Sequence, residues 1–320
     1  MRVFLKNFGL FALSLIAISY VFVWIFEIPK REAIQNGTHD TAQKWEDIRN
    51  PNNNFDLIIL GSSRGDSAYN PAIIDSVANT HSYNLCSGSQ NLIESYYILK
   101  EVLKYQQPDF IVFDSYLPSF SEDPDYFHVL NNGEFMSRSG RWDMIINGFG
   151  IQGVAHYALP ILKYRTYIQK DFKQLFGNKK VVIKKAKRIE GFYYGEEIVD
   201  ATTVRSFGPL ESLEETTIAN DQVQKYLGLI KELCKSYNVE ILPVRAPYPP
   251  SRQANFPDPA HVYFKNVLSE QELSLHDFNY IQLAGLKDED FSDDRHLNFR
   301  GANKVSKALG GLILQSKTRQ

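Results

Sequence analysis

The chain has 320 residues, with 35 Lys and Arg against 37 Asp and Glu, two cysteines and an apolar fraction of 43%. A net charge of −2 offers no excess of positive potential to a polyphosphate backbone, which argues against a general nucleic-acid binder. Two cysteines exclude a disulfide-stapled scaffold and any multi-thiolate metal site. The fold must therefore be held together by an apolar core.

The first segment predicts a membrane span. Residues 7–26 carry no charge, and a helix of this length crosses a hydrocarbon core of roughly 30 Å. Arg2 and Lys6 precede the segment, and Tyr20 and Trp24 lie toward its far end, where aromatic side chains favour the membrane interface. The positive-inside rule then predicts a single-pass protein of the cytoplasmic membrane. Its N-terminus is inside and its main domain is periplasmic or extracellular.

A cleaved signal peptide is the alternative for this segment. Its apolar centre normally has about 7 to 15 residues and ends at a small-x-small site, whereas this run ends in Trp24-Ile25-Phe26. An uncleaved anchor over residues 1–30 is therefore favoured. The polar residues 31–54 indicate a stalk, and the Pro and Asn residues at its end mark the start of a domain over 55–320.

Short apolar runs in this domain predict strands buried on both faces. Between them, amphipathic patterns predict helices over about 91–105, 221–237 and 300–315. This alternation predicts a three-layer α/β fold around a mostly parallel sheet. Residues 117–220 break the alternation and are interpreted as a mostly helical insertion. The predicted strands cover residues 57–60, 83–86, 110–113, 239–244 and 278–281.

A serine follows the first predicted strand. The strand ends in Gly61-Ser62-Ser63-Arg64, and ligands of parallel sheets bind at the carboxyl ends of the strands. Ser63 lies on the tight turn, where a nucleophile would be exposed. Ser67, in a literal Gly-Asp-Ser sequence, is an alternative, but it lies past this turn.

A second candidate segment precedes the last predicted helix and reads Asp293-Asp294-Arg295-His296-Leu297-Asn298. A carboxylate three residues before a histidine can reach its Nδ1, which leaves Nε2 to accept a proton from a serine hydroxyl. Asp294 competes with Asp293 for this role. The plainer interpretation makes His296 a surface loop residue and Asn298 the cap of the helix.

Taken together, the two segments resemble the SGNH hydrolase superfamily, also called GDSL-type esterases, over about residues 55–115 and 239–316. The resemblance implies a flavodoxin-like sheet and no cofactor. It implies Ser63 as nucleophile, His296 as general base and Asp293 as its partner. The backbone N–H groups of Ser63 and Gly88 would form the oxyanion hole.

The chain departs from the family pattern at two places. Ser62 stands where the family usually has Asp. The third block normally supplies an Asn side chain to the oxyanion hole, but this chain has Asp114-Ser115-Tyr116 there. Ser115 is the suggested replacement, and Ser115 and Asn298 are the predicted substrate-binding residues. One oxyanion-hole donor can be worth on the order of 3 kcal/mol, so the departure bears directly on activity.

Two functions from different classes follow. The first is a membrane-anchored serine esterase or O-acyltransferase that acts on acyl groups of cell-envelope polysaccharide or another small ester. The second is a weakly active or inactive accessory protein that binds a glycan or a membrane partner protein. The histidines show no metal-ligand spacing with carboxylates, so no metal site is expected.

Overall fold

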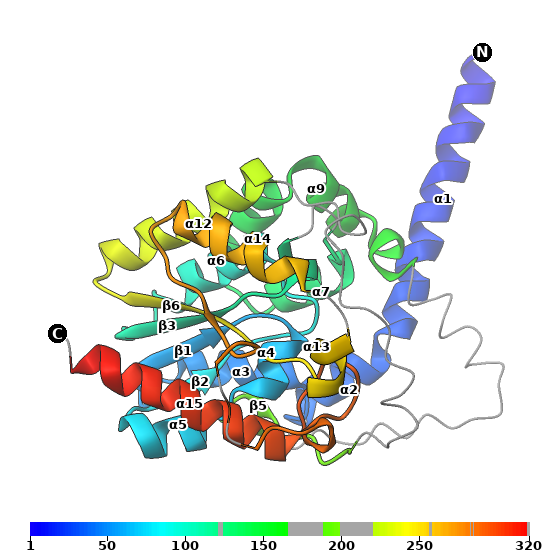
Figure 1. The fold of residues 1–320 in the computed structure, drawn as a ribbon. Helices are drawn as coiled ribbons and strands as arrows, with labels where there is room; N and C mark the ends of the chain where they lie inside the picture. The colour runs from blue at the N-terminus through cyan, green and yellow to red at the C-terminus, as the bar shows by residue number, and fades with distance from the viewer. Residues whose placement is uncertain are drawn as a thin grey trace. The chain divides into compact units, whose positions relative to one another are not determined.

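The computed structural model describes residues 1–120, 124–165, 188–198, 220–255, 258–281, 283 and 285–318. These residues form two compact units (Figure 1). The first unit comprises Met1–Trp45 and the described part of residues 126–185. The second comprises Glu46–Asp125 and the described residues from 188 to 318. Each unit is described by itself below.

The second unit is built on a five-stranded parallel sheet with the strand order β2-β1-β3-β6-β7. Its central strands are short and apolar, and every residue of β1 and β3 is buried, as expected for strands covered on both faces. The strands are β1 (Leu57–Leu60), β2 (Ser82–Asn84), β3 (Phe110–Asp114), β6 (Glu240–Arg245) and β7 (His276–Asp277).

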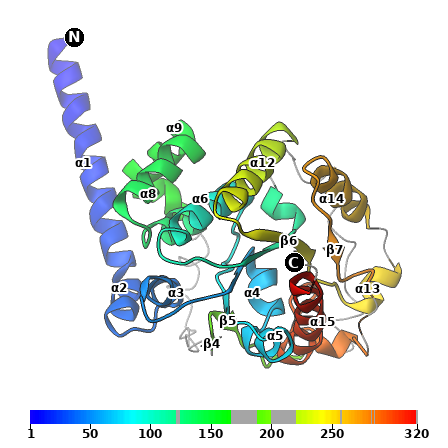
Figure 2. The same cartoon turned by 90° about the vertical axis from the view of Figure 1, so that its left-hand side faces the viewer.

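Helices cover both faces of this sheet, which makes the unit a three-layer α/β fold. Figure 1 shows α6, α12 and α14 on one side and α4, α5 and α15 on the other, and Figure 2 shows the same division from a second direction. The α/β class predicted from the sequence is thereby confirmed. The helices are α4 (Ser63–Ala68), α5 (Pro71–Ala78), α6 (Leu92–Val102), α12 (Asn220–Ser236), α13 (Pro250–Asn255), α14 (Pro259–Ser269) and α15 (Phe299–Lys317).

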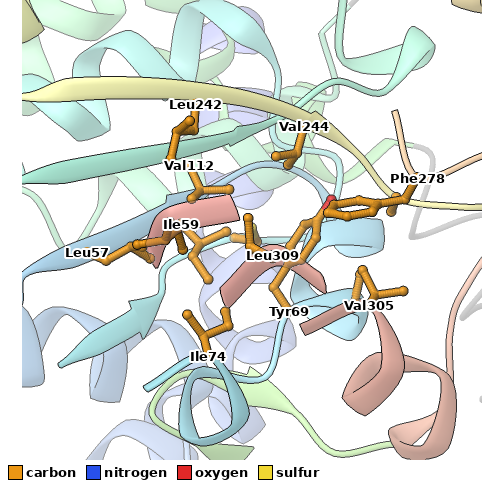
Figure 3. Close-up of a cluster of buried hydrophobic side chains, with 14 of the residues drawn as sticks. Leu57, Ile59, Tyr69, Ile74, Val112, Leu242, Val244, Phe278, Val305 and Leu309 are labelled. Atoms are coloured by element: carbon orange, nitrogen blue, oxygen red, sulfur yellow. The ribbon is translucent and has the colours of Figure 1, made fainter. Parts of the chain in front are cut away.

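The core lies between the sheet and the pair α5 and α15. Leu57, Ile59 and Val112 of the sheet face Ile74 of α5 and apolar residues of α15 in one buried cluster (Figure 3). The two helices cross closely, since a Cβ at Gly310 would lie 2.8 Å from the Val77 Cβ. This packing fixes the start of α15 near the carboxyl ends of the strands.

The first unit is helical. Its α1 (Arg2–Phe26) is long and apolar enough to cross a membrane, and Val23 is its only buried residue. The Tyr20 hydroxyl at the end of α1 donates to the Ala158 carbonyl of α9, 2.5 Å away. The remaining elements are α2 (Ile28–Gln35), α7 (Tyr126–Gly133), α8 (Arg138–Asp143), a π-helical turn (Met144–Gly148) and α9 (Gly150–Ala158).

Three details differ from the sequence analysis. The strand predicted over residues 278–281 is wrong: β7 occupies His276–Asp277, and the chain then turns, with the N–H groups of Tyr280 and Ile281 donating to the Asp277 carbonyl. The predicted stalk contains most of α2 and all of α3 (Asp40–Arg49). The described residues 126–165 of the predicted insertion group with the N-terminal residues, and a small hairpin, β4 (Arg188–Ile189) with β5 (Phe192–Tyr193), belongs to the second unit.

Candidate active site

The turn after β1 places Ser63 at the carboxyl edge of the sheet. Gly61 is required there, since a Cβ at this position would lie 2.7 Å from the Asp114 Cβ on the neighbouring strand. Ser62 is the N-cap of α4, and its hydroxyl accepts a hydrogen bond from the Arg64 N–H at 3.4 Å. Ser63 is the first residue of α4 and is partly exposed, while the residues that follow it are buried.

The segment before α15 forms a tight loop that holds an acid and a base together. A β-bridge pairs Phe291 with Leu297, and the Ser292 N–H donates to the His296 carbonyl at 2.9 Å. Within the loop, Oδ1 of Asp293 accepts hydrogen bonds from the N–H groups of Arg295 at 2.8 Å and His296 at 2.7 Å. The backbone of the loop therefore fixes the direction of the Asp293 carboxylate.

Ser63, His296 and Asp293 are hydrogen-bonded in series. The Ser63 Oγ lies 2.9 Å from the His296 Nε2, and the His296 Nδ1 lies 2.7 Å from the Asp293 Oδ2. Both distances are those of normal hydrogen bonds. If Nδ1 donates to the carboxylate, Nε2 is left as an acceptor for the Ser63 proton, which is the tautomer a general base needs.

The Asp293 carboxylate is suited to this position. Burial raises its pKa, but hydrogen bonds from the His296 ring and from the two backbone N–H groups, with attraction to the charge of His296, lower the pKa to about 2. The group is therefore ionised at neutral pH. It can stabilise an imidazolium that forms when His296 takes a proton.

A cavity of about 450 Å³ lies in front of Ser63 and His296. Most of its lining residues carry polar side chains, and Tyr116, Pro118 and Pro124 add apolar surface. The lining residues are Ser62, Ser63, Ser89, Asn91, Tyr116, Pro118, Ser119, Pro124, Asp125, Arg295 and His296.

Gly88 lies in the turn between β2 and α6, next to cavity-lining Ser89. Its oxyanion-hole role stays a prediction. Ser115 is not brought to the cavity: its N–H donates to the Val244 carbonyl at 2.7 Å, and its side chain is fully buried. Its hydroxyl has no hydrogen-bond partner within the described parts of the chain.

Asn298 acts as a helix cap rather than as a substrate-binding residue. Its Oδ1 accepts from the N–H groups of Arg300 and Gly301, and its Nδ2 donates to the carbonyls of Glu289 and Phe291. The side chain is fully buried by these contacts. The predicted substrate-binding role of Asn298 is therefore corrected, because these four bonds engage both ends of its amide and leave it no access to the cavity.

The competing candidates lie elsewhere. Ser67 is buried, and its hydroxyl donates to the Arg64 carbonyl at 3.1 Å. Asp294 pairs through both oxygens with the Arg295 guanidinium, at 3.0 Å each, and with Arg252 at 3.2 Å. Neither residue forms a hydrogen bond or ion pair with His296.

The sequence analysis missed Asn91. Its Oδ1 caps α6 by accepting from the Glu94 N–H at 2.8 Å. Its Nδ2 is buried and has no hydrogen-bond partner among the described residues, although the side chain lines the cavity and is only 5% exposed. An Asn that precedes a helix is interpreted as a helix cap in any sequence. The sequence therefore gives no indication that the Nδ2 group of Asn91 is available to a ligand.

Arg64, directly after Ser63, was also missed. Its Nη2 donates to the carbonyls of Ala246 at 2.6 Å and Pro247 at 3.0 Å, and its guanidinium lies 3.9 Å from the Tyr248 ring centroid. Arg64 is 1% exposed. It thus ties the turn that carries Ser63 to the segment that follows β6. Nothing in the local sequence pattern indicates this long-range contact.

No cluster of three or more His, Cys, Asp or Glu side chains suited to a metal ion occurs within the described residues.

Comparison with known proteins finds similarity to solved structures, two of which are described here. No family model matches the chain, and no curated protein matches it. A crystal structure from Bacteroides fragilis, provisionally named an acylhydrolase, aligns over 86% of this chain and 94% of its own with 10% identity and a TM-score of 0.42. A structure from Streptococcus pneumonia, provisionally named a platelet activating factor, aligns over 93% and 99% with 14% identity and a TM-score of 0.31.

Proposed function

We propose that this chain is a serine-dependent ester hydrolase or O-acyltransferase. The observation that carries the proposal is the series of hydrogen bonds from Ser63 through His296 to Asp293 at the edge of a polar cavity. The Ser63 Oγ attacks an ester carbonyl while the His296 Nε2 takes its proton. The bond to the alkoxy group then breaks, and His296 returns the proton to the leaving alcohol.

An acyl group is then held on Ser63 as an ester. A second hydroxyl, from water or from an acceptor alcohol, gives its proton to the His296 Nε2 and attacks the acyl carbonyl. Water yields a free carboxylic acid, and an alcohol yields a new ester. In both cases the proton returns from His296 to the Ser63 oxygen, so the enzyme is regenerated.

Asn91 is the side-chain amide that we assign to the oxyanion hole, together with the N–H groups of Ser63 and Gly88. Leaving an amide donor buried without a partner costs about 1–3 kcal/mol, which fits a donor retained for a ligand. The cap contact with the Glu94 N–H holds Oδ1 in place and leaves Nδ2 for this role. Asn91 would then replace the amide that the third block lacks.

The serine proposal is tested with a small acetyl ester and a fluorophosphonate label. Ser63→Ala should abolish both hydrolysis and labelling, and His296→Ala should abolish labelling because it removes the base. Ser67→Ala is the matched control and should leave both unchanged, since Ser67 lies outside the cavity. Equal hydrolysis by the Ser63→Ala variant and the native chain would remove Ser63 from the mechanism.

Asn91 is tested by replacements that keep the cap. Asn91→Ser and Asn91→Asp each retain an oxygen for the Glu94 N–H but lose the Nδ2 donor. Loss of one oxyanion donor should lower kcat by about a hundredfold or more with little change in thermal stability. A kcat within twofold of the native value for Asn91→Ser would exclude Asn91 from the oxyanion hole.

The substrate class that we propose is acyl groups on cell-envelope polysaccharide. Two features support it: α1, which would anchor the chain with its N-terminus in the cytoplasm and its larger unit outside, and the polar cavity, which suits a sugar ester. The test supplies acetylated polysaccharide with and without an acceptor glycan. Acetate release indicates a hydrolase, and acetyl transfer to the acceptor indicates a transferase.

An accessory glycan-binding protein is the second candidate function. It is favoured by one observation, the absence of an amide side chain at the end of β3, where Ser115 is buried. Glycan binding without labelling of Ser63 would support this function. Labelling that depends on His296 would contradict it.

A further inference from the structure

A second cavity, of about 410 Å³, lies entirely within the first unit and apart from Ser63 and His296. It is lined by the end of α1, by residues of α7, α8 and α9, and by the segment after α9. Its wall combines aromatic and apolar surface with several charged groups.

The position of this cavity along α1 is informative. Tyr20, Val23 and Trp24 belong to the last two turns of the charge-free run, and Glu27 directly follows the helix. These residues span about 10 Å at 1.5 Å per residue. If α1 crosses the membrane, this is the depth at which the hydrocarbon ends and the polar headgroups begin.

Both carboxylates that line the cavity are paired with cations, and two of these cations, Lys30 and Arg31, lie outside the cavity lining. Glu134 pairs with Lys30, and Glu27 lies 3.6 Å from the Lys163 Nζ and 4.0 Å from Arg31. Two carboxylates therefore face three cations before Arg141 is counted. A further ligand at this place should be an anion.

Arg141 is the cation without a counter-charge. Its guanidinium lines the cavity, and no carboxylate of the described residues forms an ion pair with it. Its Nε is buried and lacks a hydrogen-bond partner among the described residues. A guanidinium is a preferred partner of phosphate, because its planar donors match the phosphate oxygens.

We propose that this cavity binds the phosphate of an anionic phospholipid, with Arg141 as the main ligand and Lys163 as the second. The proposal rests on the anchoring of the chain by α1, but not on catalysis at Ser63. The phosphate occupies the charged side of the cavity. The glycerol and first acyl carbons lie against Trp24, Leu130 and Pro160, which supply the apolar wall.

The state of Lys163 supports an anionic ligand. Burial and the nearby charge of Lys30 lower its pKa to about 8, although Glu27 and Glu134 oppose this shift. The negative charges of Glu27 and Glu134 thus do not fully offset the effect of burial and of Lys30 on the Lys163 ammonium. A phosphate beside it would stabilise its charged form.

The test uses the full-length chain in an uncharged detergent, with dioctanoyl phosphatidylglycerol, dioctanoyl phosphatidylcholine and inorganic phosphate as separate probes. Binding is measured by native mass spectrometry of the lipid adducts and by calorimetry. The native chain should bind phosphatidylglycerol at least tenfold more tightly than either other probe. Arg141→Gln should weaken this binding at least tenfold, and Arg138→Gln, an exposed cation on the same helix, should not change it.

Three results would overturn the proposal: equal binding by Arg141→Gln and the native chain, equal weakening by Arg138→Gln, or binding of inorganic phosphate as tight as that of the lipid. If Arg141→Gln does not fold, the proposal is tested by lipid binding to Lys163→Gln and by the lipid preference of the native chain. Ester hydrolysis is measured on the same samples. Lipid binding without hydrolysis contradicts only the proposed function, and hydrolysis without lipid binding contradicts only this inference.

Discussion

Asp293 uses its two carboxylate oxygens for two different contacts. One of its oxygens closes the loop by accepting two backbone N–H groups, and the other faces the His296 ring. An amide in its place could still accept from the backbone with one atom, but it would present an uncharged group to the ring. The charge of Asp293, rather than its shape, is therefore what the proposed mechanism needs.

Asp293→Asn should lower kcat by on the order of a thousandfold, because the imidazolium loses its counter-charge and the histidine tautomer is no longer fixed. The measurement is hydrolysis of the acetyl ester at pH 7. Retention of more than a tenth of the native kcat would contradict the role of Asp293.

The low pKa of Asp293 also predicts how the free energy of unfolding changes in acid. Its pKa is about 2 in the folded chain, below the value of about 3.9 expected for unfolded Asp, so it stabilises the fold above about pH 4 and loses this effect as the pH falls toward 2. The difference in free energy of unfolding between the native chain and Asp293→Asn should therefore shrink between pH 5 and pH 2. Urea unfolding at several pH values measures it, and a difference that is constant over this range would contradict the prediction.

At the scale of elements, the start of α15 supports the active-site loop. The Asn298 side chain caps the helix and also holds the carbonyls of Glu289 and Phe291, which precede the loop. Loop and helix are thus fixed by one residue. The position of His296 depends on this contact as well as on Asp293.

Asn298→Ala should therefore destabilise the fold by about 1–3 kcal/mol, through loss of the cap and of partners for buried carbonyls. It should also lower the esterase rate, because the loop is less firmly held. Thermal unfolding and kcat are the measurements, with Gln315→Ala at an exposed position of the same helix as control. Unchanged values for Asn298→Ala would show that the loop is held by other contacts.

The elements differ in how far the sequence predicts them. The apolar runs of β1, β3 and β6 predict buried strands because burial on both faces demands such runs. The two-residue β7 has no such run and exists through its pairing with β6, so its position could not be predicted. The short helices α4 and α5 also lack a long periodic pattern.

The residues of the candidate site also differ in how far the sequence predicts them. Ser63, Asp293 and His296 could be predicted because their two segments together resemble the SGNH hydrolase pattern, whereas each segment alone also fits a plain turn or a surface loop. Arg64 contacts the distant segment after β6, Asn91 lines the cavity together with residues from distant segments, and Ser115 is buried by its pairing with Val244. Such roles depend on tertiary packing and leave no mark in the neighbouring residues.

At the scale of the whole molecule, α1 predicts that the chain partitions into the membrane rather than into water. Its side chains are largely exposed in the structure, which is unfavourable in water and favourable in lipid. The full chain should therefore stay in the membrane pellet after alkaline extraction. Leu13→Arg with Ile16→Arg should release it, since each charge near the middle of a span costs about 2.5–3.5 kcal/mol.

Leu314→Arg, at an exposed position of α15, is the control for added charge and should leave the chain in the pellet. A native chain that is recovered in the supernatant would contradict the anchor.

The distance along the chain between Ser63 and His296 has a consequence for the timing of synthesis. The two residues are 233 positions apart, and the loop that carries His296 is positioned by α15. A ribosome must therefore add more than 233 residues after Ser63 before Ser63 can contact His296. If the chain is exported as it is made, it reaches the far side of the membrane without a working nucleophile, so acyl groups met during passage are left intact.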